Sequence, residues 1–336
     1  MQKDAILIVS EEFDTHTDHM IEHLTKRNER IVRFHPADFP LEDILTYSYG
    51  NARFEGILRL PKRTLNLQEV KSVWVRRPTA HRFDPTLRED DLYFARRESH
   101  HALRALWGFL DCLWVNHPLE DGKPRYKLLQ LQVANEVGLR TPRSLVTTEP
   151  EAVKQFYEEC HGKMIHKVLA WPYIADDGPG TPVNRMIYTN MVDLNKVDIS
   201  RVKYCPCLFQ EYVEKDVELR VTVVGERVFA CEIHSQQSAN PRTQIDWRNY
   251  SLHDTPHVAV TLPAPVEEAC RQLVRKFDLQ YSAMDLIRRP DGEYVFLENN
   301  PGGQYGWIEM LSGLPITEAL GDLLVKGKEA VICEPV

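Results

Sequence analysis

Short apolar runs alternate with amphipathic stretches over the first third of the chain. Ala5–Val9 is an uninterrupted apolar run bounded by polar residues, which is typical of a short buried strand. The pattern predicts further strands at 31–34 and 72–75, and helices at 16–27 and from 90 to about 110. Strands that alternate with helices indicate an α/β domain with an open, mostly parallel sheet. No G-x-G-x-x-G follows the first strand, so we interpret this domain as a scaffold rather than a dinucleotide site.

A polar break at 116–124 marks the first predicted domain boundary. Beyond it, apolar residues at helical spacing predict a helix that begins near Pro124 and stops at Gly138. An extended stretch, a second helix and a strand are expected at 143–146, 150–161 and 163–169. The segment 171–185 is rich in Pro and Gly and predicts a mobile loop.

From residue 206 onward the pattern predicts β-hairpins. Strands are expected at 208–213, 217–224 and 227–233, then a polar loop at 235–256, a helix at 265–277 and a final hairpin at 281–289 and 294–299. The chain therefore divides into three predicted parts. These are an N-terminal α/β domain at 1–117, a central domain at 118–207 and a C-terminal β-rich domain at 208–336.

Composition narrows the classes of function. The chain has 336 residues, 43% hydrophobic and 27% charged, which is ordinary globular usage. A net charge of −8 without a basic tail argues against nucleic acid or an anionic membrane as partner. No apolar run reaches the ~18 residues of a membrane span, and the N-terminus does not resemble a signal peptide. Seven cysteines without paired C-x-x-C motifs indicate neither a zinc site nor a disulfide framework, and predict a reducing, cytoplasmic setting.

The final predicted hairpin carries the first candidate site. A tight turn at Asp291-Gly292, counted back along both strands, places Asp285 opposite Glu298. Alternation puts Asn300 on the same face, so two carboxylates and an amide oxygen converge. Like charges this close need a cation between them, and such oxygen ligands suit Mg²⁺ that carries phosphates. However, Pro290 cannot donate the hydrogen bond that a tight turn wants, and a one-residue slip would break this pairing.

Two further groups of charged residues lie on predicted elements. Glu218 and Arg220 share one face of the strand at 217–224, where they suit a ribose hydroxyl and a phosphate. A surface ion pair between strands is the alternative, and it is favoured when these two residues are taken alone. Lys127 opens the helix after the first boundary, and Lys167 lies in an otherwise apolar strand. A lysine there is costly unless an anion neutralises it, although snorkelling to solvent explains it equally well.

These candidates form an ordered set along the chain. The set comprises Lys127, Gly138-Leu139-Arg140-Thr141-Pro142, Lys167, Gln210-Glu211-Tyr212-Val213-Glu214-Lys215, Glu218-Leu219-Arg220, Asp285 and Glu298-Asn299-Asn300-Pro301-Gly302. In this order and on these elements, it resembles the ATP-grasp ligases. The resemblance implies an ATP-grasp fold, in which a Rossmann-like pre-ATP-grasp domain precedes a central lid domain and a C-terminal domain with the metal site.

Further motifs extend over nearly the whole chain. They are Val73-Trp74-Val75-Arg76-Arg77-Pro78, Lys127-Leu128-Leu129-Gln130, Glu232-Ile233-His234-Ser235-Gln236, Asp246-Trp247-Arg248 and Gly303-Gln304-Tyr305-Gly306-Trp307. Together they resemble the microviridin-type peptide ligases, which make graspetides by cross-linking side chains of a ribosomal precursor peptide through ω-ester or ω-amide bonds. The resemblance implies ATP and Mg²⁺ as cofactors, a precursor peptide (leader plus core) as partner, and a homodimer.

The resemblance also implies a nucleotide site. The backbone of Glu211-Tyr212-Val213 would bind the adenine edge, with Gln210 beside it, and Glu218 would hold the ribose hydroxyls. Lys127 and Lys167 would meet the phosphates.

Metal and catalytic roles follow from the same resemblance. The implied Mg²⁺ ligands are Asp285, Glu298 and Asn300. Arg220 and Arg248 are the candidates for stabilising the transferred phosphoryl group and the anionic intermediate, and Arg242 is a weaker one. The loop at 171–185 would close over the nucleotide and exclude water.

The predicted activity is an ATP- and Mg²⁺-dependent macrocyclase. Phosphorylation of a peptide Asp or Glu carboxylate would give an acyl phosphate, which a Ser or Thr hydroxyl or a Lys amine then attacks. Two alternatives stay open: a carboxylate–amine ligase that adds an amino acid to a peptide or protein, and a non-catalytic ATP-binding regulatory protein.

Two other polar groups are interpreted without a catalytic role. His16, His19 and His23 share one helical face, where a solvated surface is favoured over a metal site. Arg76 and Arg77 follow a buried strand and suit either a peptide carboxylate or an interdomain ion pair.

Overall fold

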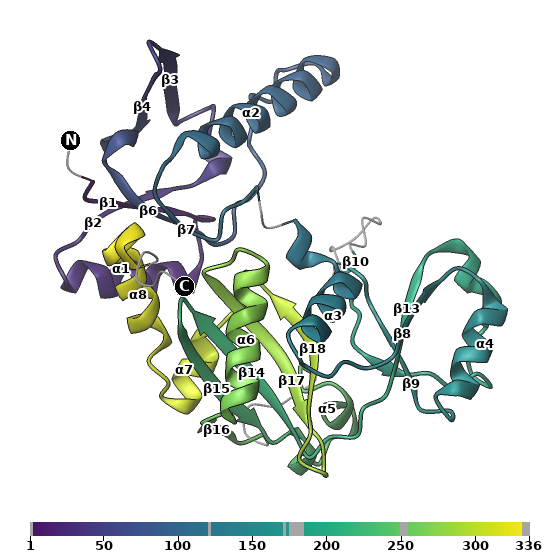
Figure 1. Cartoon of the computed structure of the whole chain (residues 1–336). Coiled ribbons are helices and arrows are strands. Elements are labelled where there is room, and N and C mark those ends of the chain that lie inside the picture. Colours follow the sequence, from purple (N-terminus) through teal and green to yellow (C-terminus); the bar gives the residue numbers. More distant parts are fainter. Residues whose placement is uncertain (1–2, 120–121, 171–172, 175–184, 249–254, 331–336) are drawn as a thin grey trace.

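The structure is a computed structural model, and it describes residues 3–119, 122–170, 173–174, 185–248 and 255–330. Its elements form three groups, and Figure 1 shows the N-terminal and C-terminal groups lying against each other while the central group, with α4, projects from them. The predicted α/β class with distinct lobes is confirmed. No helix in these ranges has the length and apolar character that crossing a membrane requires.

The N-terminal group contains the predicted parallel sheet, in the order β2-β1-β6-β7. Its elements are β1 (Ala5–Val9), α1 (Thr15–Lys26), β2 (Arg30–Phe34), β6 (Val70–Val75), α2 (Glu89–Phe109) and β7 (Leu113–Val115). Asp14 begins α1, because its carboxylate accepts a hydrogen bond of 2.8 Å from the Thr17 N–H.

A second sheet in this group was not predicted. It is antiparallel and consists of β3 (Ile44–Gly50), β4 (Arg53–Leu60) and β5 (Arg63–Asn66). Residues of β3 are exposed or only half-buried along its whole length. Leu45 and Tyr47 alternate with polar residues and pack against the core, which is a strand signal that the sequence analysis missed.

The two faces of the parallel sheet are covered by different parts of the chain. On one face, Leu7 packs in a core with Leu106 of α2. On the other, Ile8 packs in a core with Met20 of α1 and Leu320 of α8 (Ile316–Lys326). The C-terminal helix therefore completes the N-terminal domain, and neither α8 nor α7 (Gly306–Ser312) was predicted from the pattern.

The central group is built on an antiparallel sheet in the order β12-β9-β13-β8. Its elements are β8 (Ser144–Thr147), α4 (Pro150–Glu159), β9 (Met164–Lys167), β12 (Asn190–Met191) and β13 (Cys207–Glu211). Helix α3 (Lys127–Glu136) precedes them in the chain, but its Leu131 and Ala134 pack in the core of the C-terminal group. Helix α3 ends before Gly138, whose φ of +89° suits glycine. Because β13 belongs to this sheet, it spans the predicted boundary at 207, and the three-domain division stays a prediction.

Most of the predicted loop at 171–185 lies outside the described residues. Only its ends are described, where β10 (Tyr173–Ile174) pairs with β11 (Arg185–Met186).

The C-terminal group is a five-stranded antiparallel sheet in the order β16-β15-β14-β17-β18. Its elements are β14 (Val217–Val224), β15 (Arg227–Ile233), α5 (Pro241–Ile245), β16 (His257–Val260), α6 (Ala264–Lys276), β17 (Tyr281–Arg288) and β18 (Tyr294–Asn300). Every residue of the central strand β14 is buried. Leu219 and Val221 pack in a core with α6, so alternation directs Glu218 and Arg220 to the opposite face.

The last hairpin pairs Asp285 with Glu298 as predicted, but the uniform register assumed for that prediction is wrong. Nearer the turn, Leu286 pairs with Phe296, which is one residue out of the counted register. The shift occurs between Asp285 and Leu286, where Leu297 is the extra residue of a β-bulge. The bulge restores the pairing of the two carboxylates.

The turn explains why the register slips. Arg289 N–H donates to Glu293 O at 2.9 Å, so the loop contains residues 290–292 rather than the two residues expected. Gly292 takes φ +86° at the end of this loop, as a three-residue hairpin loop requires.

Candidate active site

A cleft lies between the central sheet and the C-terminal sheet. It encloses about 580 Å³. Among the predicted site residues, those that line it are Lys167, Gln210, Glu211, Tyr212, Val213, Glu218, Arg248, Asp285 and Glu298. Lys127, Arg220 and Asn300 do not line the cleft itself, although the first two pair with carboxylates that do. The structure therefore brings together residues that were predicted from distant parts of the sequence.

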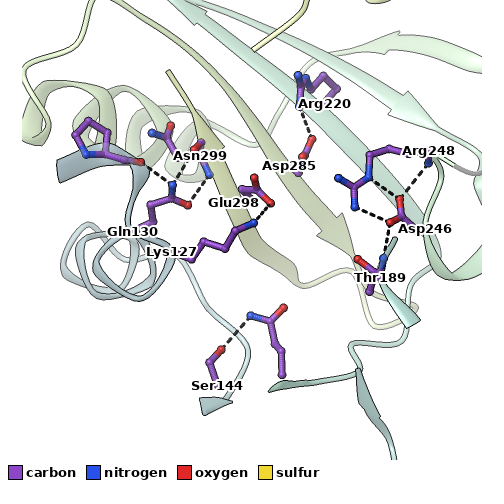
Figure 2. Close-up of polar contacts among 12 residues, drawn as sticks. Lys127, Gln130, Ser144, Thr189, Arg220, Asp246, Arg248, Asp285, Glu298 and Asn299 are labelled. Carbon is purple, nitrogen blue, oxygen red and sulfur yellow. Dashed lines mark hydrogen bonds and ion pairs between the residues drawn. The ribbon is translucent and has the colours of Figure 1, made fainter. Parts of the chain in front are cut away.

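Glu298 lies among positive charges in this cleft. Lys127 Nζ donates to Glu298 Oε2 at 2.8 Å, and both side chains are largely buried (Figure 2). Burial opposes ionisation of Glu298, but Lys127 and Lys167 outweigh it and lower the pKa of the carboxyl to about 2. Burial lowers the pKa of Lys167 to about 8, against the opposing effect of Glu298. Two lysines thus face one carboxylate that is ionised at neutral pH.

Asp285 pairs with Arg220, which lies directly opposite it on β14. Arg220 Nη1 donates to Asp285 Oδ1 at 2.8 Å, as Figure 2 shows. The arginine side chain is only 7% exposed, so this cross-strand ion pair is buried. The ion pair between strands that was considered for Arg220 is therefore present, with Asp285 on β17 as its partner, but it is buried rather than at the surface.

The Gln130 side chain joins helix α3 to β18 through hydrogen bonds. Gln130 Nε2 donates to Asn299 O at 2.8 Å, and Gln130 Oε1 accepts from Asn299 N–H at 2.9 Å (Figure 2). The Asn299 side chain accepts from Ser282 on the other side of the strand. These buried bonds hold Lys127 and Glu298 in register, and the sequence pointed to Gln130 only as part of a motif.

The segment Gln210–Val213 forms one wall of the cleft. Gln210 Nε2 donates to Ser144 Oγ at 3.0 Å, while its buried Oε1 has no hydrogen-bond partner among the described residues. The Glu211 carboxylate accepts from Arg143 Nε at 2.8 Å and so turns away from the cleft centre. Tyr212 N–H donates to Lys163 O at 2.9 Å, which fixes the backbone where the chain leaves β13.

Glu218 is buried and already paired within the protein. Lys215 Nζ donates to Glu218 Oε1 at 2.7 Å, and Ser235 Oγ donates to its other oxygen. Burial raises the pKa of Glu218, against these two contacts. In the sequence, Lys215 and Ser235 were named only as members of motifs, and no contact of either with Glu218 was predicted.

Arg248 is oriented by Asp246 in the loop after α5. Its Nε and Nη2 donate to the two carboxylate oxygens at 2.8 and 2.6 Å (Figure 2). Thr189 N–H donates to the same carboxylate at 3.0 Å, which ties the loop to the central group. The guanidinium holds the pKa of Asp246 at about 2, although burial opposes this. This bidentate pairing uses two of the five guanidinium donors and leaves Arg248 Nη1 available to the cleft, which Arg248 lines.

The backbone after Asn300 is held by side chains from both terminal groups. From the N-terminal group, Asn116 Nδ2 donates to Pro301 O at 2.9 Å, Arg76 donates to Gly302 O, and His16 Nε2 accepts from Gly306 N–H at 3.0 Å. From the C-terminal group, Tyr281 Oη donates to Gly303 O at 2.8 Å and Arg220 donates to Gln304 O at 3.1 Å. A Cβ at position 303 would lie 2.5 Å from Ala283 Cβ, so only glycine fits there. This loop fixes the end of β18.

Two interpretations of the polar groups are settled by these contacts. His16 is not on a solvated face, because it accepts from Gly306 N–H and its ring packs on Tyr305. Arg76 pairs with Asp14 of the same group, with Nε 3.6 Å from Asp14 Oδ2, so the expected ion pair between domains is not found among the described residues. Its link to the C-terminal group is a hydrogen bond to Gly302 O. His19 is exposed on α1 as expected.

The oxygen ligands predicted for Mg²⁺ are two carboxylates and one amide. Within the described ranges, no group of three His, Cys, Asp or Glu side chains is placed to hold a metal ion. Asp285 and Glu298 are cross-strand neighbours, and Asn300 lies two residues further on the same strand. This donor set fits a hard cation whose remaining oxygens come from phosphates, since Mg²⁺ is usually bound in that way.

Comparison with known proteins agrees with the geometry. A family model described as the MvdD pre-ATP grasp domain matches residues 5–121. The macrocyclase MdnC of Microcystis aeruginosa MRC, solved with its precursor peptide MdnA, is 28% identical with a TM-score of 0.82, over 96% of this chain and 99% of that chain. MdnB of the same organism is 29% identical with a TM-score of 0.77, over 96% and 99%.

A third structure is a RiPP-associated ATP-grasp ligase of Chryseobacterium gregarium, in complex with ADP and a leader and core peptide. It is 28% identical with a TM-score of 0.86, over 96% of each chain. No curated protein matches the sequence.

The matched domain, the two β-rich lobes and the cleft between them give the chain an ATP-grasp fold, which it shares with these peptide ligases. Within that class, the resemblance to the microviridin-type peptide ligases is confirmed over nearly the whole chain.

Proposed function

We propose that this protein is an ATP-dependent macrocyclase that joins side chains of a ribosomally made precursor peptide through ω-ester or ω-amide bonds. The observation that carries the proposal is the group Lys127, Glu298 and Lys167, which leaves a net positive charge beside a carboxylate in the cleft. Such a group suits a triphosphate with its metal ion. The similarity to macrocyclases over 96% of the chain supports the peptide as substrate.

The nucleotide site is proposed on the central wall of the cleft. The buried Gln210 Oε1 without a partner is an acceptor for the adenine amino group, and the adjoining backbone of Glu211–Val213 would bind the ring edge. Glu218 would accept from the ribose hydroxyls. Because Lys215 and Ser235 already hold its carboxylate, Glu218 is a rigid acceptor rather than a mobile one.

The phosphate site is proposed at the Glu298 end. Lys127 and Lys167 would bind phosphate oxygens, and Asp285, Glu298 and Asn300 would hold Mg²⁺. The ion would withdraw charge from the phosphates that it bridges. In the structure the two carboxylates pair with Lys127 and Arg220, so binding of the metal nucleotide would exchange these partners.

The chemistry requires two transfers. An oxygen of a peptide Asp or Glu carboxylate attacks the γ-phosphorus, the bond to the β-phosphate oxygen breaks, and ADP leaves. A Ser or Thr hydroxyl or a Lys amine then attacks the acyl carbon, loses its proton and expels phosphate. Arg220 and Arg248 would stabilise the negative charge that develops in both steps. Asp246 holds the Arg248 guanidinium in place, and Arg220 keeps its hydrogen bond to Gln304 O when Asp285 turns to the metal ion.

Mass spectrometry distinguishes the proposed function from the two alternatives. The full chain is incubated with a candidate precursor peptide, ATP and Mg²⁺, and ADP release is followed in parallel. Macrocyclisation removes the mass of one water for each cross-link, whereas amino-acid ligation adds a residue mass. ATP binding without peptide-dependent ADP release would support the non-catalytic alternative and contradict the macrocyclase.

The role of Arg248 has its own test. Arg248→Ala should lower the single-turnover rate by about 100-fold while nucleotide affinity changes less than about threefold, since the arginine is proposed to act on developing charge. Arg242, the weaker candidate for this role, is exposed in α5 and does not line the cleft, so Arg242→Ala is the comparison and should keep the wild-type rate. An unchanged rate in Arg248→Ala removes this residue from the mechanism.

The proposal also includes the oligomeric state, the cellular compartment and the division into domains. The family resemblance supports a homodimer, and the cysteines of the described ranges are all free, which supports a reducing, cytoplasmic setting. The division into domains at 1–117, 118–207 and 208–336 belongs to the same proposal.

A further inference from the structure

A second large pocket lies apart from the cleft, at the carboxyl edge of the N-terminal sheet. It is open and encloses about 1360 Å³. Val9 ends β1, Val75 ends β6, and both residues line it. In the sheet order β2-β1-β6-β7, the strand that follows β1 lies on one side of the central pair β1 and β6, and the strand that follows β6 lies on the other side. Open parallel sheets bind ligands at the point where the strand order reverses in this way.

The pocket combines an apolar floor with a cationic wall. Leu103 and Trp107 of α2 are buried on the floor. Arg96, His100 and Arg104 also line it, and their spacing of four residues places them on one face of the same helix. Figure 1 shows α2 extending beyond the N-terminal sheet, so this face continues out of the pocket.

The positive charge of this wall is not neutralised by the protein. No Asp or Glu lines the pocket among the described residues, in a chain whose net charge is −8. Among the described residues, neither Arg96 nor Arg104 takes part in an ion pair or a hydrogen bond. Burial lowers the pKa of His100, and the positive charge of Arg104 adds to this effect.

One further group faces this wall. His81 Nδ1 lies 2.8 Å from Pro36 O, to which it donates, so its Nε2 is free to accept or, when protonated, to donate to a ligand. His81 thus offers a polar contact that does not cancel the positive charge.

The spacing of the charges matches an extended chain. At ~1.5 Å per residue, Arg96 and Arg104 are separated by roughly 12 Å along the helix. Side chains four residues apart on an extended peptide are separated by roughly 13 Å and point to the same face. Two carboxylates at that spacing would meet both arginines while the residues between them lie over the apolar floor.

We propose that this pocket binds an acidic, extended peptide segment through Arg96 and Arg104. The source of the segment rests on the proposed function, in which the substrate is a peptide that carries Asp or Glu side chains. The pocket would then hold part of that peptide away from the cleft where the bond forms.

Direct binding to the full chain tests the site without nucleotide. The probe is the fluorescein-labelled peptide Glu-Ser-Val-Ser-Glu, followed by fluorescence anisotropy, with Gln-Ser-Val-Ser-Gln as the neutral match. We expect the acidic peptide to bind about tenfold more tightly than the neutral one. The double variant Arg96→Gln/Arg104→Gln should lose about tenfold in affinity for the acidic peptide.

The matched control is Arg97→Gln. Arg97 is the next residue on α2, and its guanidinium lies 5.7 Å from the centre of the Tyr93 ring instead of lining the pocket. This variant should bind the acidic peptide as the wild type does. Equal loss in Arg97→Gln, equal binding of both peptides, or displacement of the peptide by an equal concentration of citrate would overturn the proposal.

Failure of this site is distinguishable from failure of the proposed function. If the acidic peptide binds as expected but no precursor is ever cross-linked, the site stands and the macrocyclase falls. If Arg96→Gln/Arg104→Gln cross-links a precursor with wild-type KM and kcat, and the acidic peptide does not bind the wild type, the macrocyclase stands and the site falls.

Discussion

Glu298 carries the charge on which the proposed metal and phosphate site depends. Glu298→Gln keeps the shape of the side chain but removes its charge, which leaves Lys127 without its ion-pair partner. We expect ADP release to fall by about 100-fold or more, because a carboxylate ligand of the metal ion is lost. Thermal unfolding should show a folded protein.

Glu293→Gln is the control for this substitution, since Glu293 lies at the tip of the same hairpin and pairs with Arg140. Turnover in this variant should match the wild type. Normal turnover in Glu298→Gln would show that the metal assignment is wrong.

Lys167 predicts a pH dependence of nucleotide binding. Burial lowers its pKa to about 8, so the free protein loses this positive charge as the pH rises through 8. ATP affinity should therefore be roughly tenfold weaker at pH 9 than at pH 7.5, because binding must take up a proton. Lys167→Arg keeps its charge over this range and should bind ATP with nearly constant affinity. If isothermal titration shows the same loss of ATP affinity between pH 7.5 and pH 9 in both proteins, Lys167 does not bind the phosphates as proposed.

At the scale of elements, the loop after β18 depends on a neutral histidine in α1. His16 accepts from Gly306 N–H, and burial, followed by Arg76, lowers its pKa to about 4. Its pKa in the unfolded chain is close to 6.5, so the unfolded state binds the proton first as the pH falls. This contribution to stability is complete above pH 6.5 and is lost toward pH 4, by about 1 kcal/mol after allowance for solvent exposure.

His16→Gln tests this dependence because glutamine accepts the same hydrogen bond without titrating. Its free energy of unfolding in urea should fall less between pH 7.5 and 4.5 than that of the wild type. His19→Gln, at an exposed position on the same helix, should retain the wild-type difference.

In the hairpin of β17 and β18, the predicted pairing of Asp285 with Glu298 is present although the predicted turn and register are wrong. Its turn has one residue more than predicted, which fits the expectation that Pro290 disfavours a two-residue turn. The extra residue of the bulge, Leu297, compensates for this change of register. Asp285 and Glu298 therefore face each other because of packing along β18, where Phe296 is fully buried in the core beside Leu286. Local turn chemistry alone would have separated them.

At the scale of the whole molecule, Asn116 joins the N-terminal sheet to the hairpin. Its amide donates to Tyr281 O and Pro301 O at 2.8 and 2.9 Å, and its carbonyl accepts from Gln280 N–H at 2.8 Å. Asn116→Asp would turn the donor into an oxygen that faces two carbonyl groups. We expect a loss of about 2–4 kcal/mol in the free energy of unfolding, measured by urea denaturation.

Asn51→Asp makes the same chemical change at an exposed turn and should shift stability by less than about 0.5 kcal/mol. A similar small shift in Asn116→Asp would mean that the junction between the two groups is not stabilised by this side chain.

Sequence predicted local elements well where one face of each is buried. Strands β1, β2 and β6 with the helices beside them, β14 and β15, and helices α3, α4 and α6 have clear apolar periods. The elements that the sequence pattern missed include β3–β5, β7, β12, β16, α7 and α8, and α5, which lies in the segment predicted as a polar loop. The predicted roles of the site residues stay predictions, although the structure places nine of them around one cleft.

The sequence by itself determined which residues carry charge and which segments have a buried face, because period and composition are local properties. Only the tertiary structure decided the partners: Arg220 with Asp285, His16 with Gly306, and α8 with the N-terminal sheet. These contacts join residues far apart in the chain, and no local period encodes them. The physical reason is that burial selects a partner by shape and charge across the assembled core, after the elements themselves have formed.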